Sequence, residues 1–149
     1  MTRILVPIDP AEPARTRSAI EEVVRMRRTE QVRIRLLRVV PKVSGHVAML
    51  FGTQELLDLQ MEQGAEELQY AQKLLDLAGV PYASTVLVGR TAETIAIAAR
   101  DYGCDRIVFG SDEPGLAGRI FGSLAQQVRQ HLGASGQAGG DTRPQVIGS

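Results

Sequence analysis

Hydrophobic residues follow two patterns that alternate along the chain. Short runs rich in apolar residues are typical of parallel strands covered on both faces, and they lie at 4–8, 32–40, 82–88, 107–109 and 144–147. Between them, apolar residues recur at helical spacing, which predicts helices at 13–28, 53–79, 91–103 and 122–132. Strands that alternate with helices predict an α/β fold of three layers, with helices on both faces of a five-stranded parallel sheet.

Prolines, threonines and glycines indicate where the helices begin and end. Pro13 suits a first helical position, because its fixed φ and missing N–H cost nothing there. Thr53 and Thr91 are expected as N-caps. Gly79 and Gly103 are expected as C-caps, where a left-handed backbone is common.

Two of the predicted elements have a mixed surface. Arg33 and Arg35 alternate with apolar residues and are expected to mark the exposed beginning of the second strand. The long second helix carries one apolar stripe, which predicts either core packing or a subunit contact. The stripe consists of Leu57, Met61, Gly64, Leu68, Ala71, Leu75 and Ala78.

A glycine-containing stretch follows the fourth strand. Gly110 and Ser111 end the apolar run, and Gly122 and Ser123 open the last helical pattern. A strand, a glycine loop and a helix start can bind an anion, because free backbone N–H groups and the helix dipole converge there. An ordinary strand-to-helix connection is the alternative for such a loop. Asp9 follows the first strand, so a neighbouring first and fourth strand would bring both loops to one crevice.

Composition and charge narrow the class of protein. The 149 residues fit one domain spanning 1–149, with a flexible loop expected at 133–143, where small and polar residues dominate. Equal numbers of basic and acidic residues, 17 of each, give no overall field for nucleic acid or an anionic membrane. The single cysteine, Cys104, is expected to be a small buried residue and fits a reducing cytoplasm. No signal peptide or membrane span is predicted.

Several motifs in order resemble the universal stress protein family, over the chain to about Leu132. The resemblance rests on the segments Ile-Leu-Val-Pro-Ile-Asp (4–9), Leu-Leu-Arg-Val-Val (36–40), Val-Leu-Val-Gly (86–89), Gly-Cys-Asp-Arg-Ile-Val-Phe-Gly-Ser (103–111) and Gly-Leu-Ala-Gly-Arg-Ile-Phe-Gly-Ser-Leu (115–124). It implies a sheet of order 3-2-1-4-5, a homodimer formed through the edge of strand 5, and ATP or another adenine nucleotide at the switch point.

The resemblance also implies which residues bind the nucleotide. Asp9 would hold the ribose or adenine end, the Val39 backbone would contact the adenine edge, and Gly110 would begin the phosphate loop. The remaining contacts would hold the phosphates at a helix start. These are made by Gly115, Gly122, Ser123 and Leu124.

One segment departs from the family's pattern. Between Ser111 and Gly115 the loop is shorter, and Asp112-Glu113-Pro114 replaces a glycine. Two carboxylates oppose an anionic ligand unless Mg²⁺ accompanies it. The loop is therefore predicted to be partly degenerate.

Three functions follow from these observations. The leading one is a cytoplasmic stress-response protein that binds ATP or another adenine nucleotide. The alternative is a dimeric interaction or regulatory protein of the same fold that binds no nucleotide. An enzyme is the third, with weak ATPase activity at most, because no catalytic constellation and no protein metal site stand out.

Overall fold

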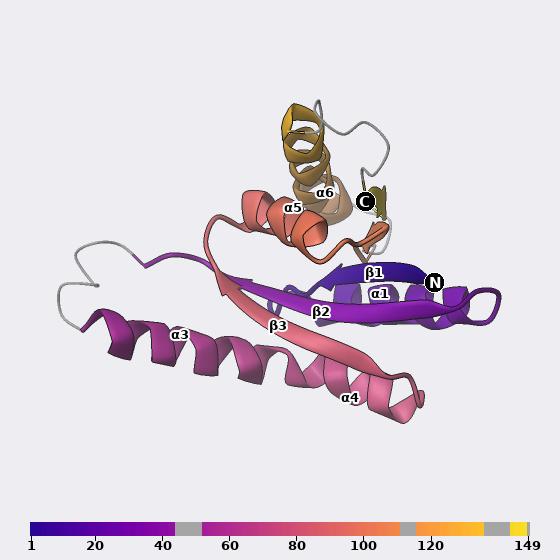
Figure 1. Cartoon of the computed structure of the whole chain (residues 1–149), viewed down its shortest axis with the longest axis horizontal. Helices are drawn as coiled ribbons and strands as arrows, with labels where there is room; N and C mark the ends of the chain where they lie inside the picture. Colours follow the sequence, from indigo (N-terminus) through magenta and orange to yellow (C-terminus); the bar gives the residue numbers. More distant parts are fainter. Residues whose placement is uncertain (44–51, 111–115, 136–143, 149) are drawn as a thin grey trace.

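The computed structural model describes residues 1–43, 52–110, 116–135 and 144–148. Five parallel strands form one sheet in the order β3-β2-β1-β4-β5 (Figure 1). The strands are β1 (Thr2–Pro7), β2 (Val32–Val40), β3 (Tyr82–Val88), β4 (Arg106–Val108) and β5 (Gln145–Ile147). The helices are α1 (Pro13–Arg27), α3 (Thr53–Glu67), α4 (Gln69–Leu77), α5 (Thr91–Asp101) and α6 (Leu116–Ser135). The predicted strand order and the predicted parallel sheet are both confirmed.

Alternating residues of the central strand face two separate hydrophobic cores. Ile4 and Val6 of β1 pack among buried residues of α1 and α4, whereas Leu5 packs among those of α5 and α6. All three side chains are fully buried. The helices accordingly cover both faces of the sheet, with α5 and α6 on one side and α1, α3 and α4 on the other (Figure 1). Three layers result, as the sequence predicts.

Helix α1 begins at Pro13, as the sequence predicts, and Glu12 precedes it as the N-cap. Its buried stripe contains Ala19, Ile20 and Val23. The stripe continues toward the first turn at Arg15 and Thr16, which are 7% and 4% exposed. A buried arginine near the start of the helix is not expected from composition alone.

The helix predicted for residues 53–79 is interrupted at Leu68, and it forms α3 and α4. Leu68 keeps right-handed helical dihedral angles, so the interruption is slight. Its stripe is buried at Gly64, Leu68, Ala71 and Leu75, while Ala78 is exposed and Leu57 and Met61 are 42% and 40% exposed. Only the middle part of the stripe is therefore core.

Two glycines end helices as expected, although each lies one position after the C-cap, and the two expected N-caps are wrong. The C-caps are Ala78 and Tyr102, and Gly79 and Gly103 follow them with φ angles of +69° and +62°, the left-handed conformation common just after a helix. Thr53 and Thr91 are first helical residues rather than N-caps, and neither helix has a side-chain cap. The extended residues before them, Gly52 and Arg90, occupy the N-cap positions.

The last helix is longer than the sequence indicates at both ends. Helix α6 begins at Leu116 rather than at Gly122, and it includes residues 133–135, which were expected in a flexible loop. Ala125, Val128 and Leu132 are buried and join the core on the α5 side. Residues 136–143, the rest of the expected loop, lie outside the described residues. None of the described helices is long and apolar enough to cross a membrane.

Replacing Leu37 of β2 with alanine is expected to destabilise the protein by about 2–5 kcal/mol, because the side chain is fully buried in the α5 and α6 core. The matched control is Leu77→Ala, since Leu77 is 76% exposed at the end of α4 and its loss should cost about 0.5 kcal/mol or less. Urea unfolding followed by circular dichroism measures both. Equal losses in the two variants would contradict the assigned core.

Candidate functional site

A crevice lies beyond the C-terminal ends of β1, β2 and β4, where the strand order reverses. Strand β1 pairs with β2 on one side and with β4 on the other. The connections after β1 and β4 lead to helices on opposite faces of the sheet, and the crevice lies between them. The crevice has a volume of about 270 Å³. Its lining residues are Pro7, Ile8, Asp9, Arg15, Leu37, Arg38, Val39, Pro41, Thr91, Ile95, Phe109, Gly110 and Leu124. Four of the seven predicted site residues are therefore brought together here.

Asp9 is fixed by the turn that leads from β1 into α1. The backbone N–H of Ile8 donates to the Leu37 carbonyl (2.8 Å), which extends the pairing of β1 with β2 up to the turn. One carboxylate oxygen of Asp9 accepts the backbone N–H of Ala11 (2.9 Å), an Asx-type contact. A carboxylate has a second oxygen that can accept a ligand hydroxyl. The turn thus orients Asp9 without exhausting its acceptors.

Val39 lies near the end of β2 and is 3% exposed. Its carbonyl accepts a hydrogen bond from the Arg38 guanidinium (2.8 Å). Arg38 also forms an ion pair with Glu67 of α3, with 3.1 Å between Nε and Oε1. Because a carbonyl oxygen has two lone pairs, the Val39 backbone can still accept from a ligand. An adenine that donates a hydrogen bond to this carbonyl would share the oxygen atom with the Arg38 guanidinium.

Gly110 is required by packing at the end of β4. A Cβ atom at this position would lie 1.7 Å from the carbonyl oxygen of Arg15, in the first turn of α1. Only glycine permits so close an approach of two backbone segments. The glycine that was expected to begin a phosphate loop therefore also joins β4 to α1.

The helix start predicted at Gly122 is wrong, and this changes what the last helix can contribute. Since α6 begins at Leu116, Gly122, Ser123 and Leu124 lie beyond its first turn. Only the first four N–H groups of a helix lack partners within it, so the N–H groups of these three residues belong to the helical ladder. Leu124 is half-buried and lines the crevice. Gly115, with the whole segment 111–115, lies outside the described residues.

Two crevice arginines were missed by sequence reasoning. Arg15 is 7% exposed, and Arg38 lies in β2 beyond Arg33 and Arg35, the two arginines that are expected to mark the exposed beginning of that strand. A signal for Arg15 existed, because it lies four residues before Ala19 and eight before Val23, on the buried stripe of α1. The described lining contains these two cations and one carboxylate, Asp9, and Arg38 is already paired with Glu67. With Glu67 counted, two cations face two carboxylates, so these described residues give the crevice no net charge.

The described residues offer little for metal or thiol chemistry. Within them, no three histidine, cysteine, aspartate or glutamate side chains gather closely enough to hold a metal ion. Cys104 is 6% exposed, as predicted, and burial raises the pKa of its thiol above the ordinary value. A protonated, buried thiol is a poor nucleophile. Binding is what the geometry of the crevice supports.

An open parallel sheet whose strand order reverses at β1, with helices on both faces and a crevice at that point, defines a doubly wound α/β fold. The universal stress protein family model matches residues 1–134, and the chain belongs to this family. Among curated proteins, none matches the chain by sequence.

Solved structures of several universal stress proteins share this fold. The protein from Lactobacillus plantarum superposes with a TM-score of 0.66 at 22% identity, over 99% of this chain and 96% of the other. The Archaeoglobus fulgidus protein in complex with dAMP gives 0.63 at 17% identity, over 99% and 97%. An Arabidopsis thaliana member with AMP bound gives 0.62 at 16% identity, over 99% and 90%.

Replacing Gly110 with alanine is expected to destabilise the protein by about 1–3 kcal/mol or more, because the new methyl group would overlap the Arg15 carbonyl. Gly133→Ala in α6 is the matched control, since no atom lies within 4 Å of its Cβ position. That change should be neutral or stabilising by about 0.5–1 kcal/mol. Chemical denaturation of both variants without ligand is the measurement. An unchanged stability for Gly110→Ala would show that the contact with α1 is not tight.

Proposed function

We propose that the crevice binds an adenine nucleotide and that the protein is a cytoplasmic stress-response protein. The observation that carries the proposal is the convergence of Asp9, Val39 and Gly110 at the switch point of the sheet. The three residues converge because β1 lies between β2 and β4, so that the ends of three neighbouring strands meet at one edge of the sheet. Related structures that hold dAMP, AMP or cAMP support the same ligand class.

Each part of the nucleotide would have a distinct partner in the described crevice. The adenine edge would hydrogen-bond to the Val39 backbone, and the ribose hydroxyls would donate to the Asp9 carboxylate. The phosphate charge would lie toward Arg15 and Gly110, which adjoin one another. At about 270 Å³ the crevice is near the lower end of ligand-pocket sizes, which favours a mononucleotide over ATP. Mg²⁺ would accompany a longer phosphate chain, through Asp112 and Glu113.

Dedicated catalysis is not part of this proposal. Phosphoryl transfer needs a positioned base together with cations around the transferred group. Asp9 is the one carboxylate in the described lining, and its turn contact already commits one oxygen. Weak ATPase activity is the most that we expect.

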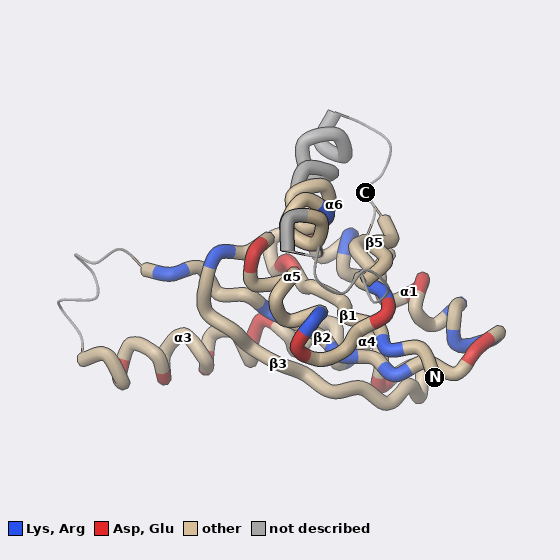
Figure 2. Tube along the Cα trace, turned by 45° about the horizontal axis from the view of Figure 1, so that its top comes forward, with Lys and Arg blue, Asp and Glu red and all other residues tan. Residues whose placement is uncertain are grey.

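The surface of α3 favours a second function, protein interaction without a nucleotide. Leu57, Leu59 and Met61 are between 40% and 50% exposed on this helix. Helix α3 contains acidic but no basic residues, and it extends past the ends of the strands (Figures 1 and 2). Exposed apolar residues with a polar rim are typical of a partner surface. A homodimer through the edge of β5 is a separate part of the proposal, since β5 is the last strand of the sheet.

Nucleotide binding is tested by thermal unfolding of protein freed of co-purified ligand. AMP at about 100 times its dissociation constant should stabilise the protein by about 2.7 kcal/mol. Asp9→Ala should abolish most of this stabilisation, and Asp9→Asn should weaken it while keeping the acceptor for the Ala11 N–H.

The control for this experiment is Asp101→Ala, an exposed residue in the last turn of α5. It should respond to AMP as the unmodified protein does. If AMP, ADP and ATP give no stabilisation, with or without Mg²⁺, nucleotide binding is contradicted and protein interaction remains as the proposed function.

A further inference from the structure

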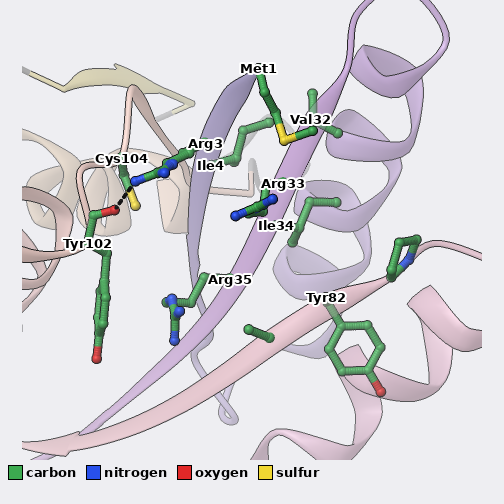
Figure 3. Close-up of a pocket in the computed structure, with 12 residues that line it drawn as sticks. Met1, Arg3, Ile4, Val32, Arg33, Ile34, Arg35, Tyr82, Tyr102 and Cys104 are labelled. Carbon is green, nitrogen blue, oxygen red and sulfur yellow. Dashed lines mark hydrogen bonds between the residues drawn. The ribbon is translucent and has the colours of Figure 1, made fainter.

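A second and larger cavity lies at the opposite end of the strands. Its volume is about 520 Å³, and it opens over the N-terminal halves of β1, β2 and β3, beside the end of α5 (Figure 3). We call it the arginine groove, after Arg3, Arg33 and Arg35. The full lining is Met1, Arg3, Ile4, Val32, Arg33, Ile34, Arg35, Pro81, Tyr82, Ala83, Tyr102 and Cys104. It shares no residue with the crevice at the switch point.

The groove exists because one face of β2 changes character along its length. Residues 33, 35, 37 and 39 face the same side, since side chains alternate along a strand. Leu37 and Val39 are buried among residues of α5 and α6, whereas Arg33 is exposed and Arg35 half-buried. The sequence correctly indicates that the two arginines mark the exposed beginning of the strand. They lie on a sheet face that the core on this side does not cover.

Register brings the three arginines close together. Arg3 of β1 pairs directly with Arg33 of β2, and Arg35 lies two residues further along. Neighbouring strands are about 4.8 Å apart, and two residues along a strand span about 7 Å. Three guanidinium groups therefore extend from backbone positions within one small area. Arg33 and Arg35 point to the same side of β2 in Figure 3.

Two of these side chains are held in place by neutral groups. The Arg35 guanidinium lies 4.1 Å from the centroid of the Tyr102 ring and donates to the Thr85 hydroxyl (2.8 Å). A terminal nitrogen of Arg3 donates to the Tyr102 carbonyl at 3.5 Å. These contacts orient the two cations and leave most of their donors unused, because each guanidinium has five N–H groups. Across the described residues, Arg33 has no ion-pair or hydrogen-bond partner.

No acidic residue belongs to the described lining of the groove. Asp105 lies next to this wall, but its carboxylate accepts the backbone N–H of Arg3 (2.8 Å). A groove between α1 and α4 differs from the arginine groove in this respect. Its basic residues are accompanied by Glu21, and its Arg25 pairs with Glu22. At the arginine groove, Asp105 is one carboxylate beside three guanidinium groups, and the remaining excess of like charge is unfavourable for the fold. An anionic ligand would reverse that effect in the arginine groove.

We propose that the arginine groove binds a phosphorylated small molecule with at least two negative charges, such as a diphosphate. Arginine is suited to this ligand class, because its planar fork donates two parallel hydrogen bonds to a phosphate. The volume lies within the range of small-molecule pockets. A single-stranded nucleic acid is disfavoured, because its successive bases need several stacking platforms, whereas Arg35 lies over the Tyr102 ring and Tyr82 is the other aromatic residue of the lining. The proposal is independent of nucleotide binding in the crevice.

Calorimetric titration of the full chain with inorganic pyrophosphate, without Mg²⁺, tests the proposal. Binding is expected, with orthophosphate and sulfate markedly weaker, because two phosphoryl groups can engage more of the three arginines. Arg33→Gln should weaken pyrophosphate binding about tenfold or more, the loss typical of a hydrogen bond to a charged group. Arg33 is exposed, and its side chain has no hydrogen-bond or ion-pair partner within the described residues, so this variant should fold normally.

Two controls separate the groove from other sites. Arg17→Gln removes an exposed arginine of α1 from the groove that contains Glu21, and it should bind pyrophosphate unchanged. Asp9→Ala, which alters the crevice, should also bind it unchanged. Failure of AMP binding with intact pyrophosphate binding would therefore refute only the proposed nucleotide function.

Three results would overturn the proposal. The first is the absence of pyrophosphate binding at millimolar concentration. The second is equal binding by the Arg33→Gln variant, or equal affinity for sulfate, which would indicate unspecific ion attraction. The third is a single-stranded oligonucleotide that binds more tightly than pyrophosphate and depends on Arg33, which would assign the groove to nucleic acid instead.

Discussion

The pairing of β1 between β2 and β4 is the constraint on which the rest of the structure depends. Parallel strands buried on both faces need helices on each side, and Ile4, Leu5 and Val6 satisfy both cores from three consecutive positions. Because strand order reverses at β1, the turns after β1 and β4 diverge and leave a crevice between them. Gly110 lets the end of β4 approach α1, which closes one wall of that crevice.

The sequence predicts the sheet well because each strand contains a short run rich in apolar residues, a signal that does not depend on distant contacts. It predicts helix boundaries less well. The helical pattern at Gly122 is real, but α6 begins at Leu116, where the glycines on either side suggest a loop. Leu68 interrupts one long amphipathic stripe without a breaking residue, so no local signal marks the division into α3 and α4. These outcomes depend on tertiary packing, which outweighs intrinsic helix propensity.

The candidate site can be predicted from the sequence only in part. Asp9 and Gly110 follow strand ends and Val39 lies near one, and these ends meet at one edge of the sheet once the topology is known. The sequence does not predict that Arg15 and Arg38 line the crevice, because a charged residue on a helix or strand is usually exposed to solvent. The same holds at the other end of the sheet, where Arg3 and Arg33 become neighbours only through the register of β1 with β2. Arginine side chains thus line both the crevice and the arginine groove of a chain whose formal net charge is zero.

The most direct test of the account is a titration of ¹⁵N-labelled protein with AMP, followed by amide chemical shifts. The central claim is that the switch-point crevice is the adenine-nucleotide site. It predicts that the amides of Asp9, Val39 and Gly110 shift and saturate together, while those of Arg33 and Arg35 stay unchanged. Shifts confined to the arginine groove, or none at all, would contradict it.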